Sequence, residues 1–355
     1  MYKNRIEKLR EKMSAKGMES FLVISDPNRN YLSGFTGNES FSLITKDQAY
    51  FITDSRYTEQ ARLQVKDYQI LEYKGKIIDF IVDLVNSNGI KNITLEEDIV
   101  TLSFYQKLKE KFIGEILSGQ KEIEDIRVIK SKDEIEKIKK AASIADKGFS
   151  HMLNFIKEGM TEKEIALELE FFMKKQGASG LSFETIAASG VRSCLPHGAA
   201  SDKIVEKGEF LTLDFGCIFQ DYCSDMTRTI AIGEVTPKMI DIYNIVLEAN
   251  ERALSAIREG MVCKDVDAIA RDYIKDRGFG ANFGHGLGHG VGREIHEAPR
   301  LSPMCDVILK SGMVVTDEPG VYLPGEFGVR IEDLVLVTDE GFEVLSKSPK
   351  QLISL

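Results

Sequence analysis

The chain has 355 residues, of which 43% are hydrophobic and 29% are charged, a composition typical of a soluble globular protein with two domains. Its net charge of −10 argues against nucleic-acid binding, which normally requires a basic face. Five cysteines, an odd number without C-x-x-C spacing, form neither a disulfide framework nor a zinc knuckle, and we expect free thiols. Residues 1–20 lack the apolar centre of a signal peptide, and no apolar run approaches the roughly 20 residues of a membrane span. We therefore expect a cytoplasmic protein that makes no contact with a membrane.

The first 127 residues are predicted to form an α/β domain. Short runs of β-branched and aromatic residues predict buried strands, and amphipathic runs between them predict helices. The strands are expected at residues 21–24, 50–53 and 93–95, and the helices at residues 57–65 and 77–85. No group of residues in this part has the composition of a catalytic site.

A long helix is predicted to open the second domain. Ser131 is followed three residues later by Glu134, the spacing of a capping box at a helix N-terminus. Apolar residues then recur at helical spacing and define a buried stripe, namely Ile135, Ile138, Ala142, Ala145, Phe149, Met152, Leu153 and Ile156. We therefore place the domain boundary just before this helix and predict two domains, residues 1–127 and 128–355.

The second domain contains an internal duplication. Residues 157–160 read Lys-Glu-Gly-Met, and residues 258–261 read Arg-Glu-Gly-Met. Each segment is followed by a helical pattern that closes on a glycine, Gly177 in one half and Gly278 in the other. The two segments align without a gap over about twenty residues, the signature of a repeated structural unit.

The duplication extends to acidic residues and histidines. In each half a glycine stands six residues before a first carboxylate, a second carboxylate follows, and a histidine lies upstream. The matched residues are Gly208 with Gly312, Asp214 with Glu318, Asp225 with Glu332, and His197 with His296. We infer two copies of one unit, related by a pseudo-two-fold axis, with the site at their junction.

The first carboxylate pair lies in a predicted hairpin. Residues 211–216 and 222–232 alternate apolar and polar side chains, which is the period of half-buried strands. A turn centred between Phe219 and Gln220 sets Asp214 directly across from Asp225, with Cβ atoms about 5 Å apart. Two like charges in this position repel each other, and a bound cation reverses the sign of that interaction.

The second carboxylate pair, Glu318 and Glu332, flanks a similar turn at residues 324–326. Four carboxylates suit a hard divalent metal such as manganese, and one imidazole ligand also permits cobalt or zinc. The competing interpretation, carboxylates in solvated turns or ordinary salt bridges, does not account for their matched positions in the two halves. The sequence therefore predicts a pair of divalent ions.

Two histidines lie in a run, residues 284–292, in which every second residue is glycine. This pattern opposes a helix and predicts a strand with one bare face, open to close approach of backbone or ligand. His285 and His289 would share the other face about 13 Å apart, too far for both to bind one metal pair. Spacing alone leaves open which of the two is the metal ligand.

The second domain carries a set of short motifs, at residues 195–198, 212–216, 223–229, 286–292, 296–297, 318–320 and 329–333. These motifs resemble those of the pita-bread metallopeptidases, family M24, which include methionine aminopeptidase, prolidase and Xaa-Pro aminopeptidase. The first domain, with residues 30–35 and 53–57, resembles the creatinase-like N-terminal domain of the Xaa-Pro branch. The resemblance implies a creatinase-like α/β domain followed by an α+β pita-bread domain of two pseudo-two-fold-related halves.

The resemblance implies a role for each candidate residue. Glu318 would shuttle a proton, while His197 and His296 would polarise the carbonyl and stabilise the tetrahedral intermediate. The substrate site would be lined by His197, His285, His296 and Arg330. The implied ligands of two divalent ions, manganese first with cobalt or zinc possible, are Asp214, Asp225, His289, Glu318 and Glu332.

The resemblance also implies the reaction. A metal-activated hydroxide would hydrolyse the bond between an N-terminal residue and a following proline. The sequence does not decide between an Xaa-Pro dipeptidase and an Xaa-Pro aminopeptidase that accepts longer peptides. A homodimer is implied as well. Two alternatives, a metal-free creatinase-like hydrolase and a metal-free binding protein, lack the full ligand set, so the five intact ligands argue against both.

Overall fold

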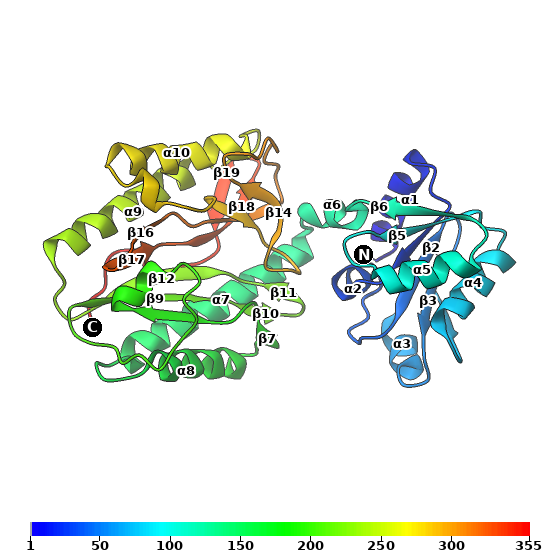
Figure 1. Cartoon of the computed structure of the whole chain (residues 1–355), viewed down its shortest axis with the longest axis horizontal. Coiled ribbons are helices and arrows are strands. Elements are labelled where there is room, and N and C mark those ends of the chain that lie inside the picture. Colours follow the sequence, from blue (N-terminus) through cyan, green and yellow to red (C-terminus); the bar gives the residue numbers. More distant parts are fainter. Residues whose placement is uncertain (1) are drawn as a thin grey trace. The chain divides into compact units, whose positions relative to one another are not determined.

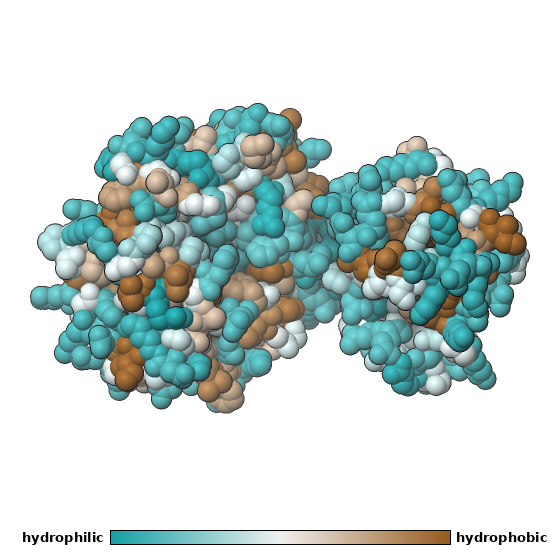
Figure 2. Space-filling view, viewed as in Figure 1, coloured by the Kyte–Doolittle hydropathy of each residue, from teal (hydrophilic) through white to brown (hydrophobic). Residues whose placement is uncertain are grey.

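The computed structural model describes residues 2–355, and the chain divides into two compact units, Met1–Arg127 and Val128–Leu355. The elements of each unit are labelled in Figure 1. Both units bury apolar side chains, and Figure 2 shows hydrophilic residues over most of the visible face of each, with apolar patches scattered among them. Among the helices of residues 2–355, none combines the length and hydrophobicity needed to cross a bilayer.

The first unit is a six-stranded mixed sheet covered by helices, in the order β4-β3-β2-β1-β5-β6. Its strands are β1 (Ser20–Val23), β2 (Phe41–Thr45), β3 (Ala49–Thr53), β4 (Gln69–Glu72), β5 (Asn92–Glu96) and β6 (Glu115–Gly119). Its helices are α1 (Tyr2–Ala15), α2 (Asp26–Ser33), α3 (Thr58–Gln64), α4 (Ile77–Ser87), α5 (Leu102–Lys111) and α6 (Glu122–Val128). The predicted strands at 21–24, 50–53 and 93–95 correspond to β1, β3 and β5.

Strand β1 shows why this sheet is covered on both sides. Phe21 and Val23 pack in one hydrophobic cluster with α1, while Leu22, between them, packs in a second cluster with α4 and α5. Successive side chains of a strand point to opposite faces, so three consecutive apolar residues require a helical layer on each side. The predicted α/β class of this unit is confirmed.

The second unit consists of two halves that each combine two helices with a small antiparallel sheet. The first half contains α7 (Lys132–Phe155), α8 (Glu162–Lys175), β7 (Gly180–Leu181), β8 (Ile186–Ser189), β9 (Glu209–Phe215), β10 (Cys217–Phe219), β11 (Tyr222–Cys223) and β12 (Met226–Ile232). The second half contains α9 (Pro237–Ala256), α10 (Cys263–Asp276), β13 (Gly288–Gly290), β14 (Glu297–Leu301), β15 (Val314–Asp317), β16 (Gly320–Leu323), β17 (Phe327–Arg330), β18 (Asp333–Thr338) and β19 (Gly341–Val344). Two 3-10 turns, η1 (Gly190–Cys194) and η2 (Gly280–Asn282), complete the unit.

The strands of the second unit form four small sheets. Two of them carry the site, a three-stranded sheet in the order β12-β9-β8 and a five-stranded sheet in the order β14-β13-β15-β18-β19. The hairpin β16-β17 and the sheet β11-β10-β7 are the others. The capping box of Ser131 and Glu134 begins α7 as predicted.

The duplicated sequence produces duplicated contacts. The backbone N–H of Gly159 donates to Val205 O, and that of Gly260 donates to Leu309 O, both at 2.9 Å. One turn further on, Lys163 pairs with Asp202 in the first half, and Lys264 pairs with Asp306 in the second. The start of α8 therefore contacts residues 202–205, and the start of α10 makes the same contacts with residues 306–309.

The predicted hairpin register between Asp214 and Asp225 is wrong. Asp214 lies opposite Thr227, and Phe219 lies opposite Tyr222, so the turn is formed by Gln220 and Asp221. Both turn residues have positive φ, 47° and 66°, as a tight two-residue hairpin turn requires. Moving the centre by one residue shifts the register by two, which keeps the carboxylates on one face because the side-chain period is two.

Candidate metal centre

Three buried side chains from three different segments meet at one point. Asp225 lies between β11 and β12, His289 lies in β13, and Glu332 lies between β17 and β18. Each offers one ligand atom, and these atoms all lie within 4.8 Å of one another. The residues are 5%, 6% and 2% exposed. An imidazole and two carboxylates held this closely form a site for a divalent cation.

The other two predicted ligands adjoin this cluster. Glu318 follows β15, and its Oε1 lies 3.4 Å from His289 Nε2. Asp214 lies in β9, where its Oδ2 accepts a hydrogen bond from Arg330 at 2.5 Å. Asp214 Oδ1 is buried and has no hydrogen-bond partner in the described chain. A buried orphan acceptor of this kind is costly unless a cation satisfies it, and this fits a second ion.

Neighbouring polar groups orient the ligands. His289 Nδ1 lies 3.1 Å from the carbonyl of Gly290, so Nδ1 carries the proton and the lone pair of Nε2 faces the carboxylates. Thr227 donates to Glu332 at 2.7 Å, and Thr316 donates to Glu318 at 3.1 Å. The ligands are thus fixed before any metal arrives.

Burial and mutual repulsion set the protonation of the carboxylates. Burial, followed by the charges of neighbouring carboxylates, raises the pKa of Asp225 and of Glu332 well above the ordinary values. Burial also raises the pKa of Glu318 to about 7. The pKa of His289 falls to about 3 because burial disfavours the imidazolium, so the ring is neutral and available as a ligand.

The five predicted ligands and four predicted substrate residues line one cavity of about 970 Å³. His296 stands edge-on to His289, with ring centroids 4.4 Å apart. His197 is exposed at the cavity wall. Arg330 donates to Tyr322 at 2.8 Å and to Thr227 at 3.0 Å, besides its bond to Asp214. The cavity therefore joins all the candidate residues of both halves.

The prediction of one continuous strand through residues 284–292 is wrong. Only Gly288–Gly290 form a strand, and His285 lies before it in irregular backbone. His285 Nε2 contacts the hydroxyl of Tyr322 at 3.0 Å, and burial lowers its pKa to about 4. The bare face does exist, because Cβ atoms on Gly288 and Gly290 would collide with the carbonyls of Thr316 and Ala298. The missing side chains therefore let strands β15 and β14 approach closely at Gly288 and Gly290.

Two residues of the cavity had no sequence signal. Tyr322 bridges Arg330 and His285 through its hydroxyl, yet it occupies an ordinary apolar position of strand β16. Arg300 lines the cavity with an exposed side chain, and it forms no ion pair with any carboxylate of residues 2–355. Arg330 forms an ion pair with Asp214, so Arg300 provides the guanidinium at this wall that is available to a ligand.

Comparisons with known proteins identify the class. Residues 136–339 match the model of metallopeptidase family M24, and residues 5–129 match the creatinase/prolidase N-terminal domain. The chain belongs to metallopeptidase family M24. It is therefore a metal-dependent peptidase with a pita-bread catalytic unit, and the predicted family, fold and enzyme class are confirmed.

Particular relatives are similar over their whole length. The structure of an Xaa-Pro dipeptidase from Bacillus anthracis is 48% identical, with a TM-score of 0.98 and full coverage of both chains. An X-Pro aminopeptidase from Thermotoga maritima is 42% identical, with a TM-score of 0.91 over 96% of this chain and 98% of that one. The Xaa-Pro dipeptidase of Pyrococcus furiosus is 40% identical over 99% of this chain and all of the relative.

We predict that Asp225→Asn removes metal binding and preserves the fold. The amide is a poor ligand, so affinity for manganese should fall by more than about 100-fold. The metal-free variant should melt no lower than the metal-free parent, because one negative charge leaves a crowded cluster. Metal content by mass spectrometry and thermal unfolding by circular dichroism test both points. Asp221→Asn, in the nearby turn, is the matched control and should keep its metal.

We predict that metal binding strengthens as pH rises toward about 8, because the buried carboxylates must release protons to become ligands. The pKa of Glu318 is raised from 4.5 to about 7 in the folded state. Its contribution to the stability of the metal-free fold is therefore full below about pH 4.5 and is lost as pH rises through about 7. Calorimetry in two buffers of different ionisation enthalpy counts the protons released. Binding at pH 7 without proton release would contradict this account.

Proposed function

We propose that the protein is a manganese-dependent Xaa-Pro dipeptidase that hydrolyses the bond before proline in a two-residue substrate. The observation that carries the proposal is the convergence of five ligand-type side chains, three histidines and one unpaired arginine in a single cavity. The named activities of relatives at 40–48% identity support the preference for proline. Domain limits of 1–127 and 128–355, a homodimer and a cytoplasmic location remain predictions from the sequence.

Two divalent ions would be held by Asp214, Asp225, His289, Glu318 and Glu332. When bound, such ions polarise a substrate carbonyl and lower the pKa of water toward neutrality. Four carboxylate ligands and one imidazole favour manganese over softer ions. The neutral state of His289 and the buried free oxygen of Asp214 support this ligand set.

Glu318 is proposed to move the proton during hydrolysis. Its carboxylate lines the same cavity as the other proposed ligands, so it is placed to accept a proton from the attacking water and return it to the departing proline nitrogen. Thr316 holds Glu318 Oε1 by a hydrogen bond and so limits its motion.

The histidines are proposed to bind the reacting group. Burial lowers the pKa of His296, so its ring is neutral and donates N–H to the carbonyl oxygen as negative charge develops there. His197, at the same cavity wall, is proposed to share this role. His285 and Arg330, joined by Tyr322, are proposed to shape the wall that receives the proline ring.

Arg300 is proposed to select dipeptides. A guanidinium without a protein partner recognises a carboxylate through two parallel hydrogen bonds. In an Xaa-Pro dipeptide the free carboxylate is attached to the proline itself, whereas in longer peptides that position is an amide. A cationic side chain in the same cavity as the metal ligands therefore favours the shorter substrate.

The substrate and metal preferences are testable together. We expect the protein loaded with manganese to hydrolyse Xaa-Pro dipeptides faster than Xaa-Pro-Yaa tripeptides and to leave Xaa-Ala dipeptides nearly intact. Manganese should give higher turnover than zinc or cobalt. Release of the N-terminal amino acid Xaa, the product common to all three substrates, is measured by chromatography and provides the rates. Inactivity on both proline substrates with every metal would refute the proposed function.

We predict that Arg300→Met raises the KM for an Xaa-Pro dipeptide by about 10- to 100-fold, the value of hydrogen bonds to a charged group. The amide Xaa-Pro-NH2 lacks the carboxylate, so parent and variant should hydrolyse it at similar rates. Steady-state kinetics on the two substrates measure the difference. An equal rise in KM for both substrates would show that Arg300 does not bind the carboxylate.

A further inference from the structure

In the C-terminal segment, residues 345–355, the side chain of Lys350 lies beside the start of strand β18, next to the proposed metal ligand Glu332. Lys350 Nζ lies 2.8 Å from Asp333 Oδ2 and donates to Asn250 Oδ1 at 2.7 Å. Its side chain is only 17% exposed. An ammonium group this far from water is retained only where buried negative charge compensates its desolvation.

Asp333 provides that charge, and a second buried carboxylate, Asp317, lies beside it. Asp317 ends β15 and Asp333 begins β18, and the two lie directly opposite each other in the antiparallel register. Both are fully buried, and Asp317 Oδ1 has no hydrogen-bond partner within residues 2–355. Burial, followed by the charge of Asp333, raises the pKa of Asp317 well above its ordinary value. Two carboxylates this close are held together only by the groups that contact them.

The position of these carboxylates makes them important for the metal centre. Asp317 immediately precedes Glu318, and Asp333 immediately follows Glu332. In the first half, the residues that precede Asp214 and follow Asp225 are Leu213 and Met226, both packed in the apolar core. The buried acidic pair is thus peculiar to the second half, where it occupies the positions that apolar residues fill in the first.

Two cations pair with Asp333, one at each carboxylate oxygen. Arg228, 1% exposed, donates to Asp333 Oδ1 at 2.8 Å and also to the carbonyl of Glu332. Lys350 is the second cation, at Asp333 Oδ2, and Asn250 connects it to Asp317 by donating to Asp317 Oδ2 at 3.2 Å. Lys350 and Asn250 thus form a bridge between Asp333 at the start of β18 and Asp317 at the end of β15.

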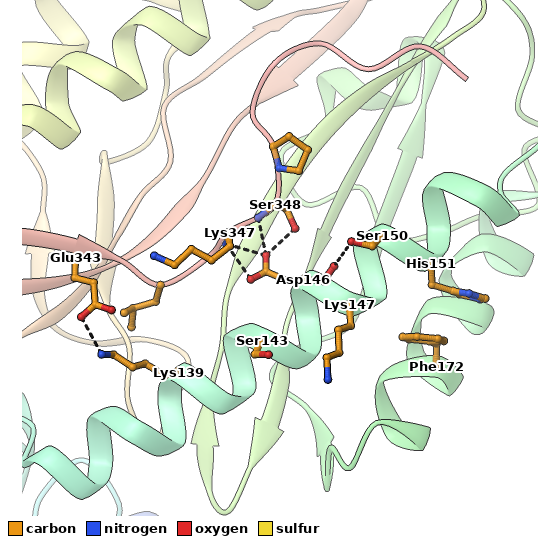
Figure 3. Close-up of a pocket in the computed structure, with 12 residues that line it drawn as sticks. Lys139, Ser143, Asp146, Lys147, Ser150, His151, Phe172, Glu343, Lys347 and Ser348 are labelled. Carbon is orange, nitrogen blue, oxygen red and sulfur yellow. Dashed lines mark hydrogen bonds and ion pairs between the residues drawn. The ribbon is translucent and has the colours of Figure 1, made fainter.

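The backbone of the C-terminal segment is fastened on both sides of Lys350. The carboxylate of Asp146, on α7, accepts hydrogen bonds from the backbone N–H groups of Lys347 and Ser348 and from the Ser348 hydroxyl, at 2.7–2.9 Å (Figure 3). Tyr243 donates to the carbonyl of Lys350 itself at 2.7 Å. Further along, Ile353 and Leu355 pair with Ala231. These contacts fix the backbone around Lys350 and so limit where its ammonium group can lie.

We propose that Lys350 is a positioning residue of the metal centre. Its ammonium group joins Asp333 to Asn250, which holds Asp317, and so keeps the ends of β15 and β18 together. Glu318 follows β15 and Glu332 precedes β18, so the C-terminal segment controls the affinity of the site for metal. The inference rests on the proposed ligand set and deepens it, because none of the residues in this bridge is itself a ligand.

The first test measures manganese affinity by calorimetry on the full chain. Lys350→Met keeps the length of the side chain and removes its charge, and we expect the dissociation constant to rise by about 10- to 100-fold, as for other residues that support ligands. Lys347→Met is the matched control in the same segment. Lys347 is exposed, and among the described residues its amine donates a hydrogen bond to the Val344 carbonyl alone, so the variant should bind manganese as tightly as the parent does.

A second variant separates positioning from general destabilisation. Asn250→Leu removes the other member of the bridge and is combined with Lys350→Met. We expect each single variant to weaken manganese binding and the double variant to bind as the weaker single variant does, to within about threefold, a coupling that unrelated sites do not show. Circular dichroism confirms that the variants are folded. Two changes that only loosen packing would weaken binding additively.

The outcomes are distinct. Parental affinity in Lys350→Met, or additive losses in the folded double variant, would overturn the positioning role. If Lys350→Met does not fold, Asn250→Leu alone tests the bridge: weaker manganese binding in that folded variant supports the role, and parental affinity overturns it. A parent protein that binds no manganese would instead refute the proposed function, whatever the Lys350 variants do.

Discussion

The structure of the second unit depends on burying Asp214, Asp225, Glu318 and Glu332 together. One arginine, Arg330, contacts the group, and it is committed to Asp214. Four carboxylates with one cation leave an excess of buried negative charge, which raises the pKa of three of them. Without metal, protonation of these carboxylates reduces the repulsion between them. With metal, the ionised carboxylates bind the cations, and their close spacing raises the affinity of the site for metal. The surrounding sheets are therefore arranged to resist repulsion as well as to exclude water.

The duplicated architecture explains how such a cluster is assembled. Each half contributes a first carboxylate from the end of a strand and a second from the following segment, because the same helix start and the same returning segment are fastened by the same contacts. Two identical halves, however, would give identical surroundings. The imidazole of His289, the free Arg300 and the acidic pair Asp317–Asp333 are all in the second half, and they make the two ends of the cavity chemically different.

The features that depend on periodicity or on the internal duplication could be predicted from the sequence. Strand and helix positions, the capping box at Ser131 and the matched carboxylates follow from periodicity and duplication, which are local signals. The register between Asp214 and its partner did not follow, because a two-residue turn at Gln220 and Asp221 depends on left-handed backbone at residues that are not glycine. Tyr322 and Arg300 were also missed. Their importance lies in contacts across the cavity, and no spacing in the chain records those contacts.

The ion network under the metal centre links the site to the end of the fold. Asp317 and Asp333 occupy positions where the first half has apolar residues, so the second half has exchanged packing for charge. Asp333 pairs with two cations, and one of them, Arg228, comes from strand β12 of the first half. The other, Lys350, comes from the C-terminal segment, which is fastened by Asp146 on the first half and Tyr243 on the second. A metal centre supported in this way is complete only when the C-terminal segment has docked on both halves. Metal affinity and the association of the two halves are therefore expected to depend on the same few buried contacts.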